Sequence, residues 1–107
     1  MGDPLNALAI KPRVIEALCG IYDPEIPVNI HELGFIYDVD VDAECVVRIT
    51  MTLTAPGCPS AQQLPIEVRE RARDVPGVKD ASVEVVWDPP WTPDRMSDAA
   101  KLQLGFL

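Results

Sequence analysis

The chain has little of what usually marks a self-sufficient metal or catalytic site. Its 107 residues include one histidine, His31, and three cysteines that nowhere occur as C-x-x-C. A glycine-rich phosphate loop and a G-x-S-x-G nucleophile motif are also absent from the sequence. The local signatures of zinc sites, phosphate loops and serine hydrolases are therefore missing, and we expect a protein that is not an enzyme.

Basic residues and long apolar runs are scarce as well. The chain has 9 Lys and Arg against 17 Asp and Glu, so it lacks the basic surface that nucleic acid and anionic membranes require. No apolar run approaches the roughly 20 residues of a membrane span. The N-terminus begins Met1-Gly2-Asp3-Pro4 without a basic n-region, and an odd number of cysteines is atypical of a disulfide framework. We expect a cytoplasmic protein.

Prolines, by contrast, are abundant. The eleven of them are scattered at the boundaries of predicted elements rather than gathered in a polar tract, so they do not indicate disorder. The sequence contains no internal repeat and no change of composition that would mark a linker. At this length the chain is one domain, and we treat residues 1–107 as a single unit.

The first part of the chain predicts a helix and a helical turn. Apolar residues at spacings of three and four predict a helix over residues 11–21, with Pro12 in its first turn. Pro24 and Pro27 then hold the chain extended. A single helical turn is predicted over residues 29–34, with Asn29 as its cap and Gly34 as a left-handed stop.

Two strands follow, over residues 35–40 and 45–53. The second strand alternates clearly between an apolar and a polar face, which predicts an antiparallel hairpin with one buried side. Its apolar face consists of Cys45, Val47, Ile49, Met51 and Leu53, and its polar face of Arg48, Thr50 and Thr52.

The second part of the chain predicts a helix, a strand and a short tail helix. The first helix covers residues 59–73, where Pro65 predicts a kink or a late start. A third strand is predicted over residues 81–87, and Ser97 caps a final helix that ends near Leu104. The order α-β-β-α-β with a tail helix predicts an α+β two-layer sandwich, in which helices cover one face of a small mixed sheet.

The most informative cysteine is Cys58. A strand-like run ends there in a Pro-Gly loop, and Pro59 suits the first position of a helix because its fixed φ is already helical. Cys58 is therefore the predicted N-cap, where free backbone N–H groups and the helix dipole favour a thiolate. Thiolates bind metals and attack electrophiles. The alternative is a buried structural cysteine, since free cysteine is among the most buried residue types.

The remaining titratable candidates give weaker signals. Cys19 and Cys45 lie near apolar faces of predicted elements, so we expect both to pack in the core. His31 is expected to be an exposed residue of its helical turn. Nothing in the sequence places it beside Cys58.

Two further residue pairs have two interpretations each. Asp23 and Glu25 could act as a carboxylate pair, although an aspartate in such a turn more often caps its own backbone. Trp87 and Trp91 either pack the tail against the sheet or present an aromatic patch to a partner.

Five short motifs occur together in this chain: D-P-E-I-P-V-N-I at 23–30, E-L-G-F-I-Y at 32–37, T-L-T at 52–54, G-C-P at 57–59 and V-W-D-P-P-W at 86–91. In this combination the chain resembles the SufT-type iron–sulfur cluster assembly family, from about residue 10 to residue 104. It is also similar to PaaD proteins and to eukaryotic cytosolic iron–sulfur targeting factors. PaaD-like proteins have an additional C-terminal cysteine-rich motif, and no cysteine follows Cys58 here.

The resemblance implies a small α+β domain with an auxiliary role in iron–sulfur cluster assembly in the SUF system. It places the family's cysteine on Cys58 and its acidic loop on Asp23 and Glu25, with Thr54 and Gly57 as candidate supporting residues. The implied cofactor is a transient iron–sulfur cluster. Because one cysteine cannot supply the four thiolates of a usual cluster, the other ligands would come from a second subunit or a partner.

The implied partners are assembly proteins or client apoproteins, and a homodimer is one way to complete the ligand set. Two other functions stay open at this stage. One is an adaptor in which Cys58 is structural and Trp87 and Trp91 recruit clients. The other is a thiol-redox protein, for which no resolving cysteine lies nearby in the sequence.

Overall fold

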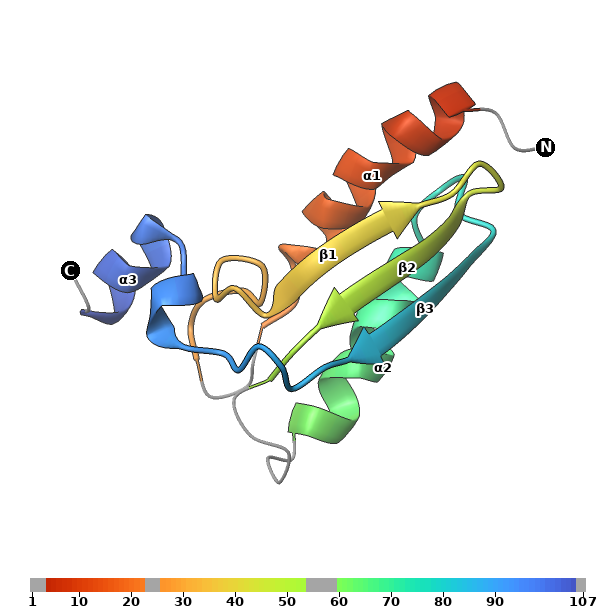
Figure 1. Ribbon diagram of the computed structural model, residues 1–107. Coiled ribbons are helices and arrows are strands. Elements are labelled where there is room, and N and C mark those ends of the chain that lie inside the picture. The colour runs from red at the N-terminus through yellow and green to blue at the C-terminus, as the bar shows by residue number, and fades with distance from the viewer. Residues whose placement is uncertain (1–3, 23–25, 54–59, 106–107) are drawn as a thin grey trace.

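The computed structural model describes residues 4–22, 26–53 and 60–105. Its elements, in chain order, are α1 (Pro4–Leu18), β1 (Ile36–Val41), β2 (Val46–Met51), α2 (Ser60–Arg73), β3 (Asp80–Val85), the 3-10 helix η1 (Pro93–Arg95) and α3 (Asp98–Leu104). One layer is the sheet, and α1 and α2 form the other layer against a single face of it (Figure 1). The predicted α+β class and the predicted element order are confirmed.

The sheet has the order β1-β2-β3, so β2 is its central strand. β1 and β2 pair antiparallel, from Ile36 opposite Met51 to Val41 opposite Val47. β2 and β3 pair in parallel and are joined through α2, with Met51 opposite Val85. As a result β2 and β3 end, and β1 begins, at one and the same end of the sheet.

The buried face of the sheet is the one that the alternation in β2 predicted. Val47, Ile49 and Met51 are at most 1% exposed, and the flanking Cys45 and Leu53 are buried as well. The helices supply the opposing apolar side chains, among them Val14 and Leu18 from α1 and Leu64, Val68 and Ala72 from α2. The other face of the sheet is polar and uncovered, with Asp38, Asp40, Arg48 and Glu84 exposed on it.

The first helix differs from its prediction at both ends. It begins at Pro4 rather than at residue 11, and it ends at Leu18 rather than at residue 21. Pro4 suits a first helical position because its missing N–H has no partner there in any helix. Pro12 therefore lies inside the helix, where it is exposed to solvent. Gly20, a poor helix former, lies in the turn that follows.

In the second half, one of the two alternatives for α2 and the predicted end of β3 are wrong. α2 runs without interruption from Ser60 through Pro65, so the late start that this proline suggested does not occur. β3 ends at Val85 rather than at Trp87, and Trp87 is 42% exposed instead of lying on the buried side. Two prolines that follow at 89–90 cannot donate backbone hydrogen bonds to extend the strand.

The predicted caps are present. The Asn29 side chain accepts a hydrogen bond from the Glu32 backbone N–H (2.9 Å), and the Ser97 hydroxyl accepts one from the Ala100 N–H (3.1 Å). Gly34 and Gly105 both adopt the left-handed conformation, with φ of 80° and 83°. Local sequence chemistry therefore decides where these turns and helices begin and end.

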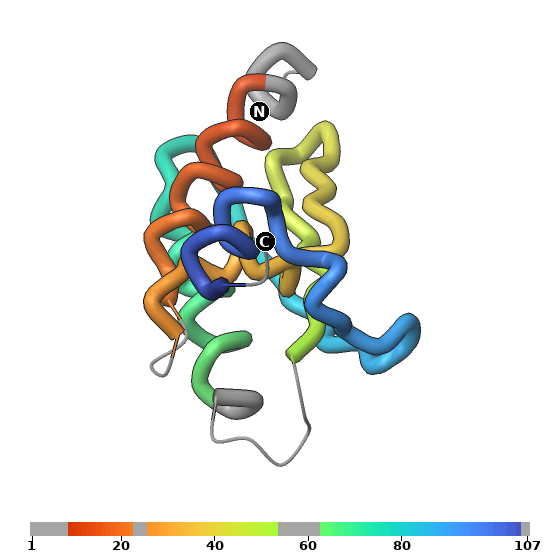
Figure 2. Tube along the Cα trace, turned by 90° about the vertical axis from the view of Figure 1, so that its left-hand side faces the viewer, coloured from red at the N-terminus to blue at the C-terminus, as the bar shows by residue number. Residues whose placement is uncertain are grey.

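After β3, residues 88–105 form a segment that we call the C-terminal strap. It contains η1 and α3, and it crosses the end of the molecule from the β3 side toward the side of α1 (Figure 2). Within the described ranges, no helix has the length and apolar character needed to cross a membrane.

Gly34 and Gly105 provide a matched test of how closely the strap packs. A Cβ at position 34 would overlap the backbone carbonyl of Arg95 in the strap, whereas a Cβ at position 105 would meet nothing within 4 Å. Gly34→Ala should lower the free energy of unfolding by roughly 2 to 5 kcal/mol, from backbone strain together with overpacking. Gly105→Ala should cost at most roughly 1 to 2 kcal/mol, from backbone strain alone.

Urea unfolding of the two variants measures this difference. Equal losses of stability in Gly34→Ala and Gly105→Ala would contradict the close approach of the strap to Gly34.

Candidate functional site

The five residues of the predicted site, Asp23, Glu25, Thr54, Gly57 and Cys58, lie outside the described residues. Their neighbours in the chain are described, however, and these show which parts of the fold the two segments connect. These flanking residues are 21–22, 26–35, 51–53 and 60–64.

The residues on both sides of the Cys58 segment are firmly held. On the N-terminal side, Thr52 and Leu53 are 0% and 3% exposed. The Thr52 N–H donates to the Phe35 carbonyl (2.8 Å), and the Val86 N–H donates to the Met51 carbonyl (2.8 Å). On the C-terminal side, α2 begins at Ser60 and is anchored by Leu64, which is 2% exposed. The segment that carries Cys58 thus joins the end of β2 to the start of α2.

The residues on both sides of Asp23 and Glu25 are also tied together. Tyr22 and Asn29 form an isolated antiparallel bridge, and the Ile30 N–H donates to the Ile21 carbonyl (2.9 Å). Residues 21–22, before Asp23, are therefore paired with residues 29–30, which follow Glu25 in the chain.

Three backbone hydrogen bonds link these two sets of flanking residues. The Ile30 N–H donates to Ile21, the Phe35 N–H donates to Ile30 (3.1 Å), and the Thr52 N–H donates to Phe35. We call this series the backbone relay. Ile21, Ile30 and Phe35 are at most 1% exposed, so water does not compete for these bonds. The structure thereby brings the flanks of Asp23 and Glu25 to the same end of the sheet as the flanks of Cys58.

Two polar residues at this end were missed or misplaced by sequence reasoning. Thr52 was assigned to the solvent face of its strand, but β2 ends at Met51 and Thr52 is fully buried. His31 was expected to be exposed, but it is half-buried, and its Nδ1 is enclosed without a hydrogen-bond partner among the described residues. A single histidine in a turn leaves no periodic signal from which its burial could be predicted.

Cys19 is half-buried just after the end of α1, so it lies less deeply than expected. Burial raises the pKa of its thiol, and the nearby carboxylates of Glu32 and Glu16 raise it further because they oppose a second negative charge. At neutral pH the protonated, poorly nucleophilic form of Cys19 is therefore favoured.

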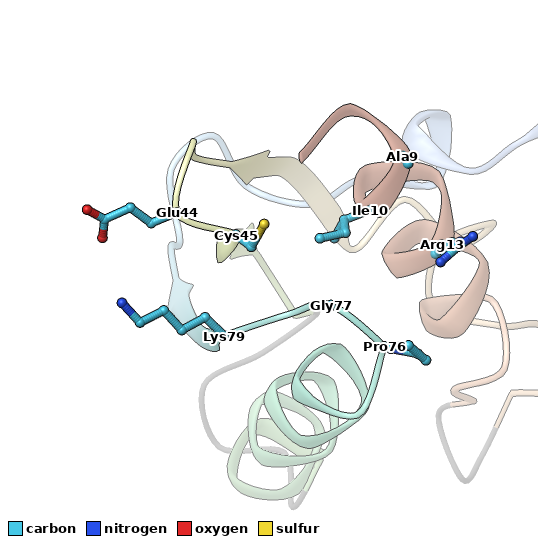
Figure 3. A pocket seen from close by; sticks show the side chains of 8 residues that line it. All are labelled: Ala9, Ile10, Arg13, Glu44, Cys45, Pro76, Gly77 and Lys79. Carbon is cyan, nitrogen blue, oxygen red and sulfur yellow. The ribbon is translucent and has the colours of Figure 1, made fainter. Parts of the chain in front are cut away.

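Cys45 lies at the opposite end of the sheet, where it lines a cleft of about 450 Å³ between α1, the β1–β2 turn and residues 76–79 (Figure 3). Its sulfur faces the interior of the cleft near Ile10, while the side chains of Glu44 and Lys79 extend away from it. The residue is 7% exposed, as expected for a core cysteine. β2, a strand of six residues and roughly 20 Å long, separates Cys45 from the end of the sheet where the chain continues toward Cys58.

The two tryptophans have different environments. Trp91 is partly buried, its Nε1–H donates to the Leu33 carbonyl (2.7 Å), and its ring meets Phe35 edge-to-face at 5.6 Å. Of the two interpretations of the tryptophans, packing within the fold therefore applies to Trp91. Trp87 is 42% exposed and follows the end of β3, so it lies beside the chain that leads into the Cys58 segment.

A metal centre is not formed by the described part of the chain alone. Among residues 4–22, 26–53 and 60–105, no group of three or more His, Cys, Asp or Glu side chains is placed to hold a metal ion.

The family model described as "Iron-sulfur cluster assembly protein" matches residues 11–85, which include both motif segments and the whole sheet. The chain belongs to this iron–sulfur cluster assembly family. The predicted resemblance is thereby confirmed.

Relatives of the chain within the family cover nearly its whole length. It is 48% identical over 98 residues to the Fe-S protein maturation auxiliary factor YitW of Bacillus subtilis, covering 92% of this chain and 96% of that protein. It is 44% identical over 85 residues to the Fe-S protein maturation auxiliary factor SufT of Staphylococcus aureus, covering 79% and 97%. The crystal structure of a domain of unknown function from Bacillus anthracis is 39% identical and superimposes with a TM-score of 0.87, covering 98% of this chain and 100% of that one.

A similar segment also occurs inside a longer protein. The chain is 33% identical over 99 residues to an iron–sulfur cluster carrier protein of Mycobacterium leprae. The match covers 92% of this chain but only 24% of the carrier. The family domain thus occurs both as a short chain and as part of a larger one.

The raised pKa of Cys19 predicts a slow reaction with thiol reagents at neutral pH. Its alkylation by iodoacetamide, followed by mass spectrometry of the native protein, should be slower than that of a free cysteine at pH 7.5. The rate should reach half its maximum only above the ordinary cysteine pKa, because only the thiolate reacts. A rate that is already maximal at pH 7 would contradict the assigned burial and the effect of Glu32 and Glu16.

Proposed function

We propose that the protein is a non-catalytic auxiliary factor that helps iron–sulfur clusters reach client proteins, with Cys58 as a thiolate ligand of the cluster during transfer. Family membership supports the general role. The backbone relay is the observation that carries the site, because it joins the flanks of Asp23 and Glu25 to those of Cys58 through Ile30 and Phe35.

The chemistry of Cys58 fits this role. α2 begins at Ser60, two residues after Cys58, and the N-terminal end of a helix stabilises a nearby anion. A thiolate is a soft ligand suited to the iron of such clusters. Asp23 and Glu25 are proposed as the acidic loop of the same site, and Thr54 and Gly57 as its supporting residues. A single thiolate would hold a cluster weakly enough to release it.

The missing ligands define the partners. A usual cluster takes four thiolates, so the other ligands would come from a second copy of this chain or from a bound assembly protein or client. The Mycobacterium leprae carrier includes a segment similar to this chain as about a quarter of its length. We propose that this shorter chain acts beside a carrier of that kind as a separate protein. The odd number of cysteines further suggests a reducing cytoplasm.

The second candidate function is that of an adaptor protein, and it rests on Trp87. Its exposure next to the Cys58 end leaves it available to a client, whereas Trp91 is engaged within the fold. We therefore propose Trp87, rather than both tryptophans, as the direct partner contact.

Replacement of Cys58 tests the proposed function in the host. Cys58→Ser keeps the size of the residue but replaces the soft thiolate with a hydroxyl. The activity of an iron–sulfur-dependent dehydratase should fall to the level of a deletion strain, while the variant protein accumulates normally.

The matched control is Cys19→Ser, which changes a cysteine of the same domain whose thiol is protonated at neutral pH. When Cys19→Ser is expressed in the deletion strain, it should restore the dehydratase activity to the level that the wild-type protein gives. Full activity with Cys58→Ser would overturn the cluster-ligand role and leave the adaptor function through Trp87.

A further inference from the structure

The hydrogen bonds of the C-terminal strap, residues 88–105, connect it to one short stretch of the chain. In the described part of the chain, every hydrogen bond between the strap and the remaining residues ends within residues 27–37. The four bonds are Gln103 Nε2–H to the Pro27 carbonyl (3.0 Å), Ser97 N–H to the Glu32 carbonyl (2.8 Å), Trp91 Nε1–H to the Leu33 carbonyl (2.7 Å) and Tyr37 O–H to the Pro89 carbonyl (2.8 Å).

Three close packing contacts of the strap lie on the same stretch of chain. The Trp91 ring lies edge-to-face on Phe35, and the Arg95 guanidinium stacks over the Tyr37 ring at 4.6 Å. The strap approaches Gly34 so closely that only a residue without a Cβ fits there. Met96 and Ala100 of the strap are also buried in the core, so it is the hydrogen bonds of the strap that single out this stretch of chain.

That stretch includes the centre of the backbone relay. Trp91 holds Leu33 by a hydrogen bond and Phe35 by ring packing, and Phe35 both donates to Ile30 and accepts from Thr52. Gln103 binds Pro27, the second residue after Glu25 in the chain. The strap therefore acts on the residues that connect the two motif segments, although it follows the region matched by the family model, which ends at residue 85.

We propose that the strap is a working part of the site and that Trp91 and Gln103 are positioning residues. They hold residues 27–35 so that the flanks of Asp23 and Glu25 keep a fixed place relative to the flanks of Cys58. This inference rests on the proposed function, in which both motifs act together. The alternative is a strap that only covers the apolar side of Phe35. Such a strap would stabilise the whole fold, and removal of one of its polar contacts would leave the site unaffected.

Two variants, each of which removes one polar contact, separate the positioning role from a purely stabilising one. Trp91→Phe keeps a ring beside Phe35 but deletes the hydrogen bond to Leu33. Gln103→Ala deletes the bond to Pro27 from an exposed position, so it carries no risk to folding. The matched control is Leu102→Ala, the neighbouring residue of α3, whose side chain is 68% exposed.

The first readout is hydrogen exchange of single backbone amides, measured by NMR. Trp91→Phe should speed exchange at Ile30 and Phe35 on the order of fivefold, which corresponds to the loss of one typical hydrogen bond. The amides of α2 should exchange at the wild-type rate, as should all amides in Leu102→Ala. A uniform acceleration that includes α2 would mean a loss of global stability and would overturn the positioning role.

The second readout is dehydratase activity in the host at equal protein level. Trp91→Phe and Gln103→Ala should each give activity between the wild type and Cys58→Ser, whereas Leu102→Ala should match the wild type. Wild-type activity with both strap variants, alongside an inactive Cys58→Ser, would overturn the inference and leave the proposed function intact. If Cys58→Ser were fully active, the proposed function would fail, and the exchange data alone would decide whether the strap positions the relay.

Discussion

The pairing of β2 with both of its neighbours determines where every other element of the fold lies. β2 is antiparallel to β1 and parallel to β3, so one end of the sheet collects the start of β1 and the ends of β2 and β3. The chain that leaves β2 there enters α2, which must cross back over the buried face to reach β3. The buried side chains of β2, each worth roughly 1.5 to 3 kcal/mol on burial, set this register, because a slip by one residue would turn them to solvent.

This arrangement brings the flanks of two sequence motifs together although they are far apart in the chain. Antiparallel pairing places Ile36 opposite Met51, so the turn before β1 lies beside residues 52–53 after β2. The hydrogen bonds through Ile30 and Phe35 extend that pairing beyond the sheet. Ile21, Ile30, Phe35 and Thr52, which form these hydrogen bonds, are all at most 1% exposed.

Most of the fold could be predicted from the sequence because its signals are local. Alternation in β2 predicted the buried face, and single residues such as Asn29, Gly34 and Ser97 predicted the caps. α1 was misplaced because Pro12 suits a first helical turn, and only the competing Pro4 shows where the helix begins. The contacts of the strap could not be predicted. Trp91 and Leu33 are 58 positions apart, and neither residue carries a local sign of the other.

The site itself was predicted only in part, for the same reason. Cys58 is indicated by local helix-start chemistry, whereas Asp23 and Glu25 were assigned through the family resemblance. The burial of Thr52 and His31 depends on where β2 ends and on what packs over the turn, and both are properties of the folded chain.

Anaerobic reconstitution with iron and sulfide would show whether Cys58 is a cluster ligand. Visible absorption and bound iron would be measured on the wild type, on Cys58→Ser and on Cys45→Ser, whose cysteine lies at the other end of the sheet. If Cys58 is a ligand, a coloured, iron-containing species should form in the wild type and in Cys45→Ser and be lost in Cys58→Ser. Equal iron and colour in Cys58→Ser, or no bound iron in the wild type, would contradict this ligand role.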